Sequence, residues 1–515
     1  MDNIIEIINT SKNTPNFICH DDGVSLLVYP RVHMFTFDLS LISGVLKHGS
    51  FGCSLKNMPI SISVKKNNFS KDSVRTVGGV DIKKLDFEID FEKLRKYIGS
   101  SDKYSIILKI NCNIQPHTGL GLSTQILGGI YLCCARISNV NLTINDLFML
   151  GIGHYSALGL NLLFNPGMIF EMGISPTDEK NGLVITPSIS EKHEAPANTV
   201  YKINQFPFYT TVAIPKSANS ISGNYEIDFW NNSLPDKDED SYKIIYNVFE
   251  KIIPAIVEKK FEVFSAALSE NIKLGSKPIE ESIQAVRTKK VLQKMREQFD
   301  FSAVSSLGPT LYAFSKNDPE EKFRLLDVDD YDFYVYTPNG KVKKKIGKDE
   351  TILIASFACL GKTTFAKSYP ELGLDIESIH YARKYNNKHP DDEIAKGDND
   401  WTPNAEYPIN YVRAVVDNLG KYKFIFLTGG KEILYELDKL NIKYSILYPG
   451  KNRKKQILVD AKKRGNDENF VMFLEELLSS EDHKNSFKDL NYERYEIIDD
   501  GKYIEEYLKE NYYYE

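Results

Sequence analysis

Two glycine-containing turns in this chain have the residue types and spacing that bind polyphosphates. The first turn lies in residues 115–135, where QPHTGLGLSTQ runs into a charge-free segment with helical spacing. A strand-like, isoleucine-rich segment (105–113) precedes it, so the order is strand, glycine turn, helix start. The free N–H groups and the dipole of a helix start favour an anion, and glycines let the backbone approach it. The predicted phosphate cradle consists of His117, Gly119, Gly121, Ser123 and Thr124. A glycine-rich helix start that packs on a sheet and binds nothing would have the same pattern.

The second turn, in TILIASFACLGKTTFAKSY (351–369), has the layout of a Walker A phosphate loop. A buried-type strand leads into GKTT, which opens a helix. In this layout backbone N–H groups cradle the phosphates, Lys362 reaches the outer phosphates and Thr363 holds magnesium. A serine stands where the pattern has its first glycine. The strand, loop and helix order favours a nucleotide site over a chance GKT. The predicted binding residues are Ser356, Gly361, Lys362, Thr363 and Thr364.

Charged residues after the second turn could complete a phosphoryl-transfer site. Asp375, in LGLDIES, could bind magnesium with Thr363 or position a substrate hydroxyl, although an aspartate there could equally cap a helix. Arg453 and Arg464 lie in KNRKKQILVDAKKRGN. Cations on a helix above a phosphate site would neutralise transition-state charge, and an exposed basic helix would look the same.

Length and composition exclude several classes of protein. A chain of 515 residues is too long for one hydrophobic core, and 42% hydrophobic with 26% charged residues is typical of a globular protein. The formal net charge of −6 argues against a nucleic-acid partner. The six cysteines have no C-x-x-C spacing, and no signal peptide or membrane segment is recognisable, so we expect a cytoplasmic protein with reduced thiols.

The elements between the turns predict how the chain is divided. An N-P-G turn (165–167) before MIFEMG predicts a hairpin that delivers Glu171 to an inner position. Segments 241–268 and 279–299 predict two long helices, and 303–314 predicts a turn that leads into a strand. Strands and helices in this order predict two α+β subdomains, and the last part predicts a parallel α/β sheet. The expected divisions are an N-terminal subdomain (1–195), a second subdomain (196–318), a charged linker with a small hairpin (319–348), and a P-loop domain (349–515).

Several segments of the first two-thirds resemble the GHMP kinase superfamily, and among its members the beta-ribofuranosylaminobenzene 5'-phosphate synthases. The segments that carry the resemblance are RVHMFTFDLS (31–40), HGSFGCSL (48–55), QPHTGLGLSTQ (115–125), AIPKSANSISGNYEIDFW (213–230) and SSLGPTLYAF (305–314). The resemblance implies a two-subdomain α+β fold that joins phosphoribosyl pyrophosphate to a hydroxybenzoate-type acceptor with magnesium, releasing pyrophosphate and carbon dioxide. Other GHMP proteins phosphorylate small alcohols with ATP, and the first turn suits either reaction. The Thr-Gln ending of the turn and the SSLGPT segment favour the transferase.

The resemblance also implies site residues and exposes departures from the pattern. Ser156, in GIGHYSALG, and Glu171 would face the phosphate cradle, with Glu171 in a catalytic role. The related proteins have an arginine where Ile152 stands, a glycine at Ala157, and an aspartate at Glu171. Loss of the arginine removes a bidentate phosphate ligand, which puts the substrate and the activity of this part in question.

The C-terminal part resembles P-loop nucleoside and nucleotide kinases, through DNDWTPNAEYPINYV (398–412), ILYPGKNRKKQ (446–456) and KKRGNDENF (462–470). The resemblance implies that Trp401 and Tyr411 line an acceptor site, although aromatic residues here could also be core. The whole chain is thus interpreted as a bifunctional transferase that uses magnesium and ATP, with phosphoribosyl pyrophosphate as the candidate substrate of the first part. The alternatives are an ATP-dependent small-molecule kinase or a catalytically inactive nucleotide-sensing scaffold in the first part, and a nucleic-acid end kinase. The expected partners are small molecules, and a homo-oligomer is left open.

Overall fold

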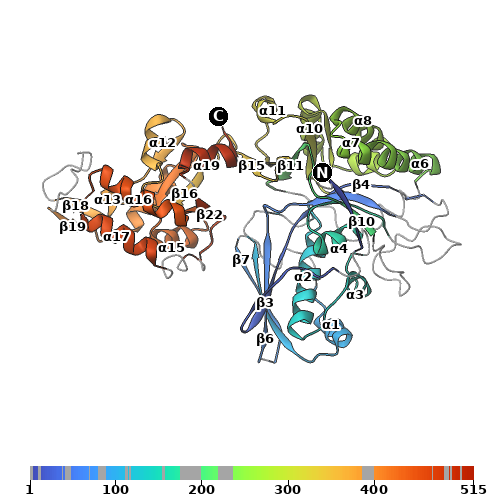
Figure 1. Cartoon of the computed structure of the whole chain (residues 1–515), viewed down its shortest axis with the longest axis horizontal. Helices are drawn as coiled ribbons and strands as arrows, with labels where there is room; N and C mark the ends of the chain where they lie inside the picture. The colour runs from blue at the N-terminus through green and yellow to red at the C-terminus, as the bar shows by residue number, and fades with distance from the viewer. Residues whose placement is uncertain are drawn as a thin grey trace. The chain divides into compact units, whose positions relative to one another are not determined.

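The computed structural model describes most of the chain and divides it into two compact units, Met1–Lys343 and Lys344–Glu515 (Figure 1). The described residues are 4–9, 13–37, 39–40, 48–68, 70–78, 88–110, 114, 117–153, 157–173, 199–217, 236–385, 400–466, 468–480, 487, 490–498 and 501–514. Among these residues, no helix combines the length with the apolar character that crossing a bilayer requires.

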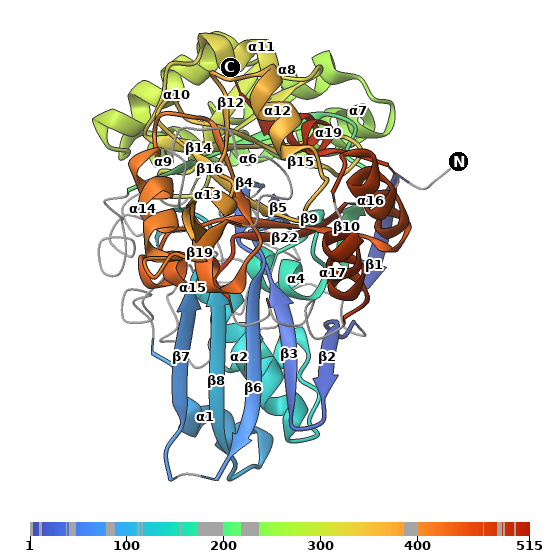
Figure 2. The same ribbon diagram turned by 90° about the vertical axis from the view of Figure 1, so that its left-hand side faces the viewer.

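The first sheet of unit 1 has five strands and is covered by the helix that follows the first glycine turn. Its order is β2 (Phe17–His20), β3 (Gly23–Val28), β6 (Ile60–Asn67), β8 (Lys103–Ile110) and β7 (Ser73–Gly78). Burial alternates along β6 and β8, as expected for a sheet with one covered face. Helix α2 (Leu122–Ile137) packs on β3 and β6 (Figure 2). The predicted strand, turn and helix around the first glycine turn are therefore confirmed.

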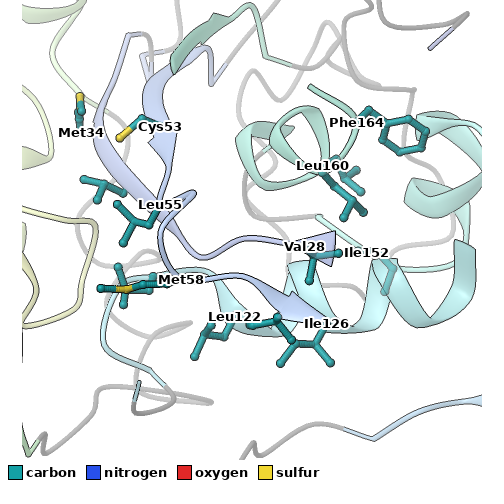
Figure 3. Close-up of a cluster of buried hydrophobic side chains, with 14 of the residues drawn as sticks. Val28, Met34, Cys53, Leu55, Met58, Leu122, Ile126, Ile152, Leu160 and Phe164 are labelled. Atoms are coloured by element: carbon teal, nitrogen blue, oxygen red, sulfur yellow. The ribbon is translucent and has the colours of Figure 1, made fainter. Parts of the chain in front are cut away.

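The second sheet of unit 1 holds Glu171 and is covered by a second apolar helix. Its order is β1 (Ile5–Asn9), β10 (Thr199–Ile203), β9 (Met168–Glu171), β5 (Ser50–Ser54) and β4 (Arg31–Thr36). Helix α4 (Ala157–Phe164) packs on β5 and β9 and also against α2. Figure 3 shows Leu160, Ile152 and Ile126 in the hydrophobic cluster of this unit. The N-P-G turn joins α4 to β9, so the predicted hairpin is wrong: a helix precedes the turn, and β9 pairs with β5 and β10.

The third sheet forms the core of the second subdomain. It contains β12 (Phe301–Val304), β13 (Leu311–Ser315), β11 (Tyr209–Pro215) and β14 (Tyr331–Tyr336), and α8 (Phe261–Asn271), α9 (Lys277–Ser282) and α10 (Val286–Gln298) pack on β12. The turn predicted within 303–314 joins the antiparallel strands β12 and β13.

Three predicted boundaries in this region are wrong. The predicted boundary at residue 196 puts β10 in the second subdomain, but this strand pairs with β1 and β9 of the first. The predicted linker contains β14, but this strand pairs along its length with β11, because its alternating aromatic side chains complete the buried sheet. The division between the two units falls inside β15 (Val342–Lys345), before the predicted start of the P-loop domain at residue 349.

The two long helices predicted for 241–268 and 279–299 are interrupted. The first consists of α6 (Asp238–Tyr246), a π-helical turn η3 (Asn247–Ile252), α7 (Ile253–Val257) and then α8. Lys259 adopts a left-handed conformation with φ 58°, which ends the helical path before α8 begins. The second consists of α9 and α10. The apolar period continues across both breaks, so periodicity alone could not locate them.

Unit 2 has a five-stranded, all-parallel sheet with helices on both faces, which confirms the predicted parallel α/β layout. The order is β17 (Gly373–Asp375), β20 (Phe424–Thr428), β16 (Ile352–Ser356), β21 (Ser445–Pro449) and β22 (Arg494–Ile498). Alternate residues of β16 belong to separate hydrophobic clusters, Ile352 and Ile354 on one face and Leu353 and Ala355 on the other. One cluster includes α12 (Lys362–Ser368), α16 (Lys451–Lys463), α17 (Glu468–Ser479) and α19 (Ile504–Asn511), and the other includes α14 (Ile409–Asp417) and α15 (Lys431–Lys439).

The strand order of unit 2 determines where its loops gather. Strand β16 is central, the chain leaves it toward β17 on one side, and β21 leads toward β22 on the other. In an open parallel sheet, ligands bind beyond the carboxyl ends of the strands where the connections diverge. The GKTT turn follows β16 directly, so the fold places it at this edge.

Candidate phosphate sites

The GKTT turn of unit 2 begins helix α12 with Gly361 in a left-handed conformation, φ 98°. The Lys362 Nζ donates hydrogen bonds to the Ser356 carbonyl oxygen at 3.1 Å and to the Phe357 carbonyl oxygen at 3.4 Å. Loss of hydration lowers the pKa of this ammonium, and the neighbouring Asp375 carboxylate opposes that shift. The lysine therefore lies across the loop with its charge partly desolvated.

Thr363 and Asp375 meet beside this lysine. The Thr363 hydroxyl donates a 2.6 Å hydrogen bond to Asp375 Oδ2, although the two residues lie on different elements, α12 and β17. Burial raises the pKa of Asp375, while Lys362 and the Thr363 hydroxyl lower it. The other carboxyl oxygen, Oδ1, is buried and has no hydrogen-bond partner. Thr364 is exposed, so the two threonines of GKTT have different surroundings.

These groups can hold magnesium only with help from a ligand. Hydroxyl and carboxylate oxygens suit Mg²⁺, which takes few protein ligands and completes its shell with water and phosphate oxygens. Within the described part of the chain, no group of three or more His, Cys, Asp or Glu residues could hold a metal ion. The Ser356 hydroxyl is also buried without a partner at the start of the same loop. Buried polar atoms without partners are uncommon, so this edge of the sheet fits a polar ligand.

The two predicted arginines of α16 differ in their surroundings. Arg453 is 1% exposed, its guanidinium carbon lies 4.1 Å from the centre of the Tyr503 ring, and its Nε and Nη2 have no partner. Arg464, at the C-terminal end of α16, is exposed and lowers the pKa of both Lys362 and Asp375 through its charge. Lys462 and Lys463 are exposed, as on an ordinary basic helix. Only part of the basic segment is therefore solvated.

The two aromatic residues expected at an acceptor site do not share one role. Tyr411 is fully buried, and its hydroxyl donates to the Ile376 carbonyl oxygen and accepts from the Thr428 amide, so it belongs to the core. Trp401 is half-buried on β19 (Trp401–Pro403) and stacks with Arg383, whose guanidinium carbon lies 4.0 Å from the ring centre.

The glycine turn of unit 1 is closely backed by the loop between β12 and β13. His117, Gly119 and Gly121 all have positive φ, of 56°, 83° and 61°. A Cβ on Gly119 would lie 2.2 Å from the Ser305 carbonyl oxygen, and one on Gly308 would lie 2.0 Å from the Gly119 nitrogen. The Ser305 hydroxyl donates to the Gly119 carbonyl oxygen at 2.9 Å. The glycines are thus required by contact between two backbones, whether or not a ligand binds.

Arg31, which belongs to neither predicted phosphate turn, supplies a cation at the start of α2. Its amide donates to the Leu120 carbonyl oxygen at 2.8 Å, and a Cβ on Gly121 would lie 2.7 Å from the Arg31 Nε. Burial and the charges of Arg31 and Lys277 lower the pKa of His33, which places these three residues in one electrostatic neighbourhood. Arg31 lies at the start of RVHMFTFDLS, but nothing in that pattern indicates which glycine it contacts.

The other predicted residues of the first cradle have mixed placements. Thr124 turns its methyl group toward α4, since a Cβ on Gly159 would lie 2.8 Å from Thr124 Cγ2. Ser123 is half-buried in the first turn of α2, and Ser156 lies outside the described residues. Ile152, where the resemblance led us to expect an arginine, is part of the hydrophobic core.

Glu171 occupies a fully buried position at the end of β9, as predicted. Burial raises the pKa of its carboxyl group to about 8, although the Ser50 hydroxyl and the Gly173 amide, which donates to Oε2 at 2.7 Å, both lower it. This carboxyl group therefore carries its proton at neutral pH in the free protein.

Comparison with known proteins finds relatives for the N-terminal part of the chain. It is 26% identical over 290 residues to a beta-ribofuranosylphenol 5'-phosphate synthase of Methanocaldococcus jannaschii, covering 55% of this chain and 87% of that protein. A synthase of the same name from Archaeoglobus fulgidus is also 26% identical, over 55% of this chain and 85% of its own. No protein-family model matches the chain.

Solved structures with similarity to this chain include GHMP-type kinases. Streptococcus pneumoniae phosphomevalonate kinase covers 59% of this chain and 94% of its own, with a TM-score of 0.42 and 8% identity. Methanococcus jannaschii mevalonate kinase covers 62% of this chain and 98% of its own, with a TM-score of 0.39 and 12% identity.

Proposed function

We propose that this chain is a magnesium-dependent transferase with two activities, one in each unit. Unit 1 transfers a phosphoribosyl group from phosphoribosyl pyrophosphate to a small aromatic acceptor, and unit 2 transfers the terminal phosphoryl group of ATP to a small, nucleoside-like acceptor. The observation that carries the proposal for unit 1 is its 26% sequence identity to the synthases over most of their length. For unit 2, it is the grouping of Lys362, Thr363 and Asp375 at the carboxyl edge of a parallel sheet.

In unit 1, the start of α2 would bind the charged end of the substrate. The first N–H groups of a helix have no partner within the helix, and the helix dipole favours an anion there. The Arg31 guanidinium lies beside Gly121 at this point and offers a planar set of donors that suits phosphate oxygens. The backing by Ser305 and Gly308 would keep the turn rigid when the anion arrives.

In unit 2, the chain's own residues would act by positioning and by balancing charge. Lys362 would exchange its contacts with the loop carbonyls for phosphate oxygens, and the hydroxyl of Thr363 would exchange Asp375 for magnesium. Magnesium, when bound, would neutralise charge on the outer phosphates. The unpartnered Oδ1 of Asp375 could accept a hydrogen bond from a water on the metal, and Arg453 and Arg464 would offset negative charge during transfer.

A second candidate for unit 1 is an inactive nucleotide-binding scaffold. It is favoured by one observation: Ile152, in the hydrophobic core, replaces the arginine expected from the resemblance. The location of Arg31 favours activity, because it supplies a guanidinium group beside Gly121 at the glycine turn.

Measurements of ATP turnover and of phosphoribosyl pyrophosphate binding, on the full chain and two variants, test the proposal. Lys362→Ala should abolish ATP turnover against a panel of nucleosides and leave the affinity for phosphoribosyl pyrophosphate unchanged. Arg31→Met should weaken phosphoribosyl pyrophosphate binding and leave ATP turnover unchanged. ATP turnover that survives in Lys362→Ala would contradict the assignment of unit 2. Binding of phosphoribosyl pyrophosphate without any transfer to phenolic acceptors would favour the scaffold over the synthase.

A further inference from the structure

We infer that Tyr503, between β22 and α19, is a positioning residue that holds Arg453 ready for the phosphates bound at the GKTT turn. The inference rests on the proposed nucleotide binding of unit 2 and concerns how its buried arginine is held. Tyr503 contacts both Arg453 and the GKTT turn. Its ring centre lies 4.1 Å from the Arg453 guanidinium carbon, and a Cβ on Gly361 would lie 3.4 Å from Tyr503 Cβ.

The path of the chain brings these residues to one edge of the sheet. Arg453 follows β21 and Tyr503 follows β22, and these strands are parallel neighbours, with the Gly450 amide donating to the Ile498 carbonyl oxygen at 2.9 Å. The Ile504 amide donates to the Leu360 carbonyl oxygen of the GKTT loop, also at 2.9 Å. The start of α19 is therefore bonded to the phosphate loop by its backbone, which fixes the backbone next to Tyr503.

The surroundings of Arg453 indicate an anionic ligand. A guanidinium group is always charged in proteins, and a buried charge without a partner is costly. Nε and Nη2 of Arg453 are buried and have no hydrogen-bond partner. Lys362 and Arg464 add positive charge near the loop, so the ligand that suits this set is a polyphosphate.

An aromatic partner has a specific advantage over a carboxylate here. The face of a tyrosine ring attracts a guanidinium group and restricts its orientation, but it takes none of the N–H donors. An aspartate or glutamate in the same place would occupy those donors and compete with phosphate. The Tyr503 hydroxyl lies 3.3 Å from Asp460 Oδ2 on α16, the helix that also carries Arg453, which further fixes the ring.

The test measures binding of magnesium tripolyphosphate and of magnesium ATP to the full chain by calorimetry. We expect Tyr503→Leu to weaken tripolyphosphate binding about tenfold and Tyr503→Phe, which keeps the ring, to stay within about twofold of wild type. Arg453→Met should weaken binding as well, and Tyr503→Leu should add no further loss in that variant, because the ring acts through the arginine. Tyr246→Leu is the matched control, since this exposed tyrosine also contacts a cation, Lys251, but lies in unit 1.

Each other outcome overturns a distinct statement. If Tyr503→Leu weakens ATP binding but not tripolyphosphate binding, the ring contacts the nucleoside and does not position Arg453. Additive losses in the double variant would also reject the inference. If Tyr503→Leu fails to fold, Arg453→Lys decides: lysine keeps the charge but stacks less well, so unchanged tripolyphosphate affinity would reject the stacking role. Wild-type chain that binds neither ligand would instead reject the proposed function of unit 2.

Discussion

The Thr363 hydroxyl donates a 2.6 Å hydrogen bond to the Asp375 carboxylate and so joins the start of α12 to the end of β17. Asp375 has its other oxygen buried without a partner, and burial raises its pKa. In the proposed complex the Thr363 hydroxyl would give up this hydrogen bond and hold magnesium instead, so the magnesium requirement of turnover should depend on this hydroxyl.

Replacing Thr363 with valine should increase the magnesium concentration needed for half-maximal ATP turnover at least about tenfold, because one oxygen ligand is lost. Thr363→Ser keeps the oxygen and should behave as wild type within about threefold. A titration of turnover against magnesium at saturating ATP measures both. Equal magnesium requirements in the valine and serine variants would show that the hydroxyl serves only the hydrogen bond to Asp375.

Two substitutions of Arg31 should distinguish the contribution of its charge to phosphate binding from that of its planar donor group. Arg31→Lys retains a cation beside Gly121 but loses the planar donor set, so we expect about tenfold weaker binding of phosphoribosyl pyrophosphate, and a greater loss for Arg31→Met. Calorimetric titration of the full chain measures both affinities, and Lys362→Ala serves as the control for unit 2. Wild-type affinity in both Arg31 variants would remove this residue from the site.

Gly308→Ala should destabilise unit 1 by at least about 3 kcal/mol. The new methyl group would lie 2.0 Å from the Gly119 nitrogen, so the backbone of one of the two turns must move. Gly99→Ala is the matched comparison. It has φ 65° with open space around it, so only the conformational cost of about 1 kcal/mol applies. Hydrogen exchange resolved by mass spectrometry reports the stability of unit 1 separately. Similar losses in the two variants would mean that the two turns can separate without strain.

Glu171 should make unit 1 less stable as pH rises. The folded-state pKa of about 8 lies above the ordinary glutamate pKa of 4.5, so between these values the folded state binds more protons than the unfolded state. Stability then falls with rising pH by at most about 1.4 kcal/mol per unit and levels off above pH 8.

Glu171→Gln should remove this slope, which hydrogen exchange of unit 1 between pH 5 and pH 8.5 would reveal. Glu262→Gln is the control, because an ion pair with Lys316 lowers the pKa of that exposed carboxyl group and its effect lies below pH 4.5. A slope that persists in Glu171→Gln would assign the pH dependence to another group.

Local pattern predicted the parts of the fold that local chemistry determines. The first glycine turn before α2, the GKTT turn after a buried strand, the parallel layout of unit 2 and the inner position of Glu171 are all confirmed. The two turns depend on residues close together in sequence, and the parallel layout follows from the alternation of strand-like and helix-like segments along the chain. The sequence does not predict where β10 and β14 belong, because strand pairing joins residues that are distant in sequence.

The order of residues along the chain is enough to predict which segments could hold phosphate, since glycines, small hydroxyls and a lysine at these spacings are local features. Which side chains meet at those segments depends on the three-dimensional fold. The contacts that no local pattern indicates join segments 50 to 189 residues apart. They are Arg31 beside Gly121, Gly308 against Gly119, and Tyr503 against both Gly361 and Arg453. No local pattern carries such contacts, because they arise from how strands order themselves within a sheet and bring their loops to one edge.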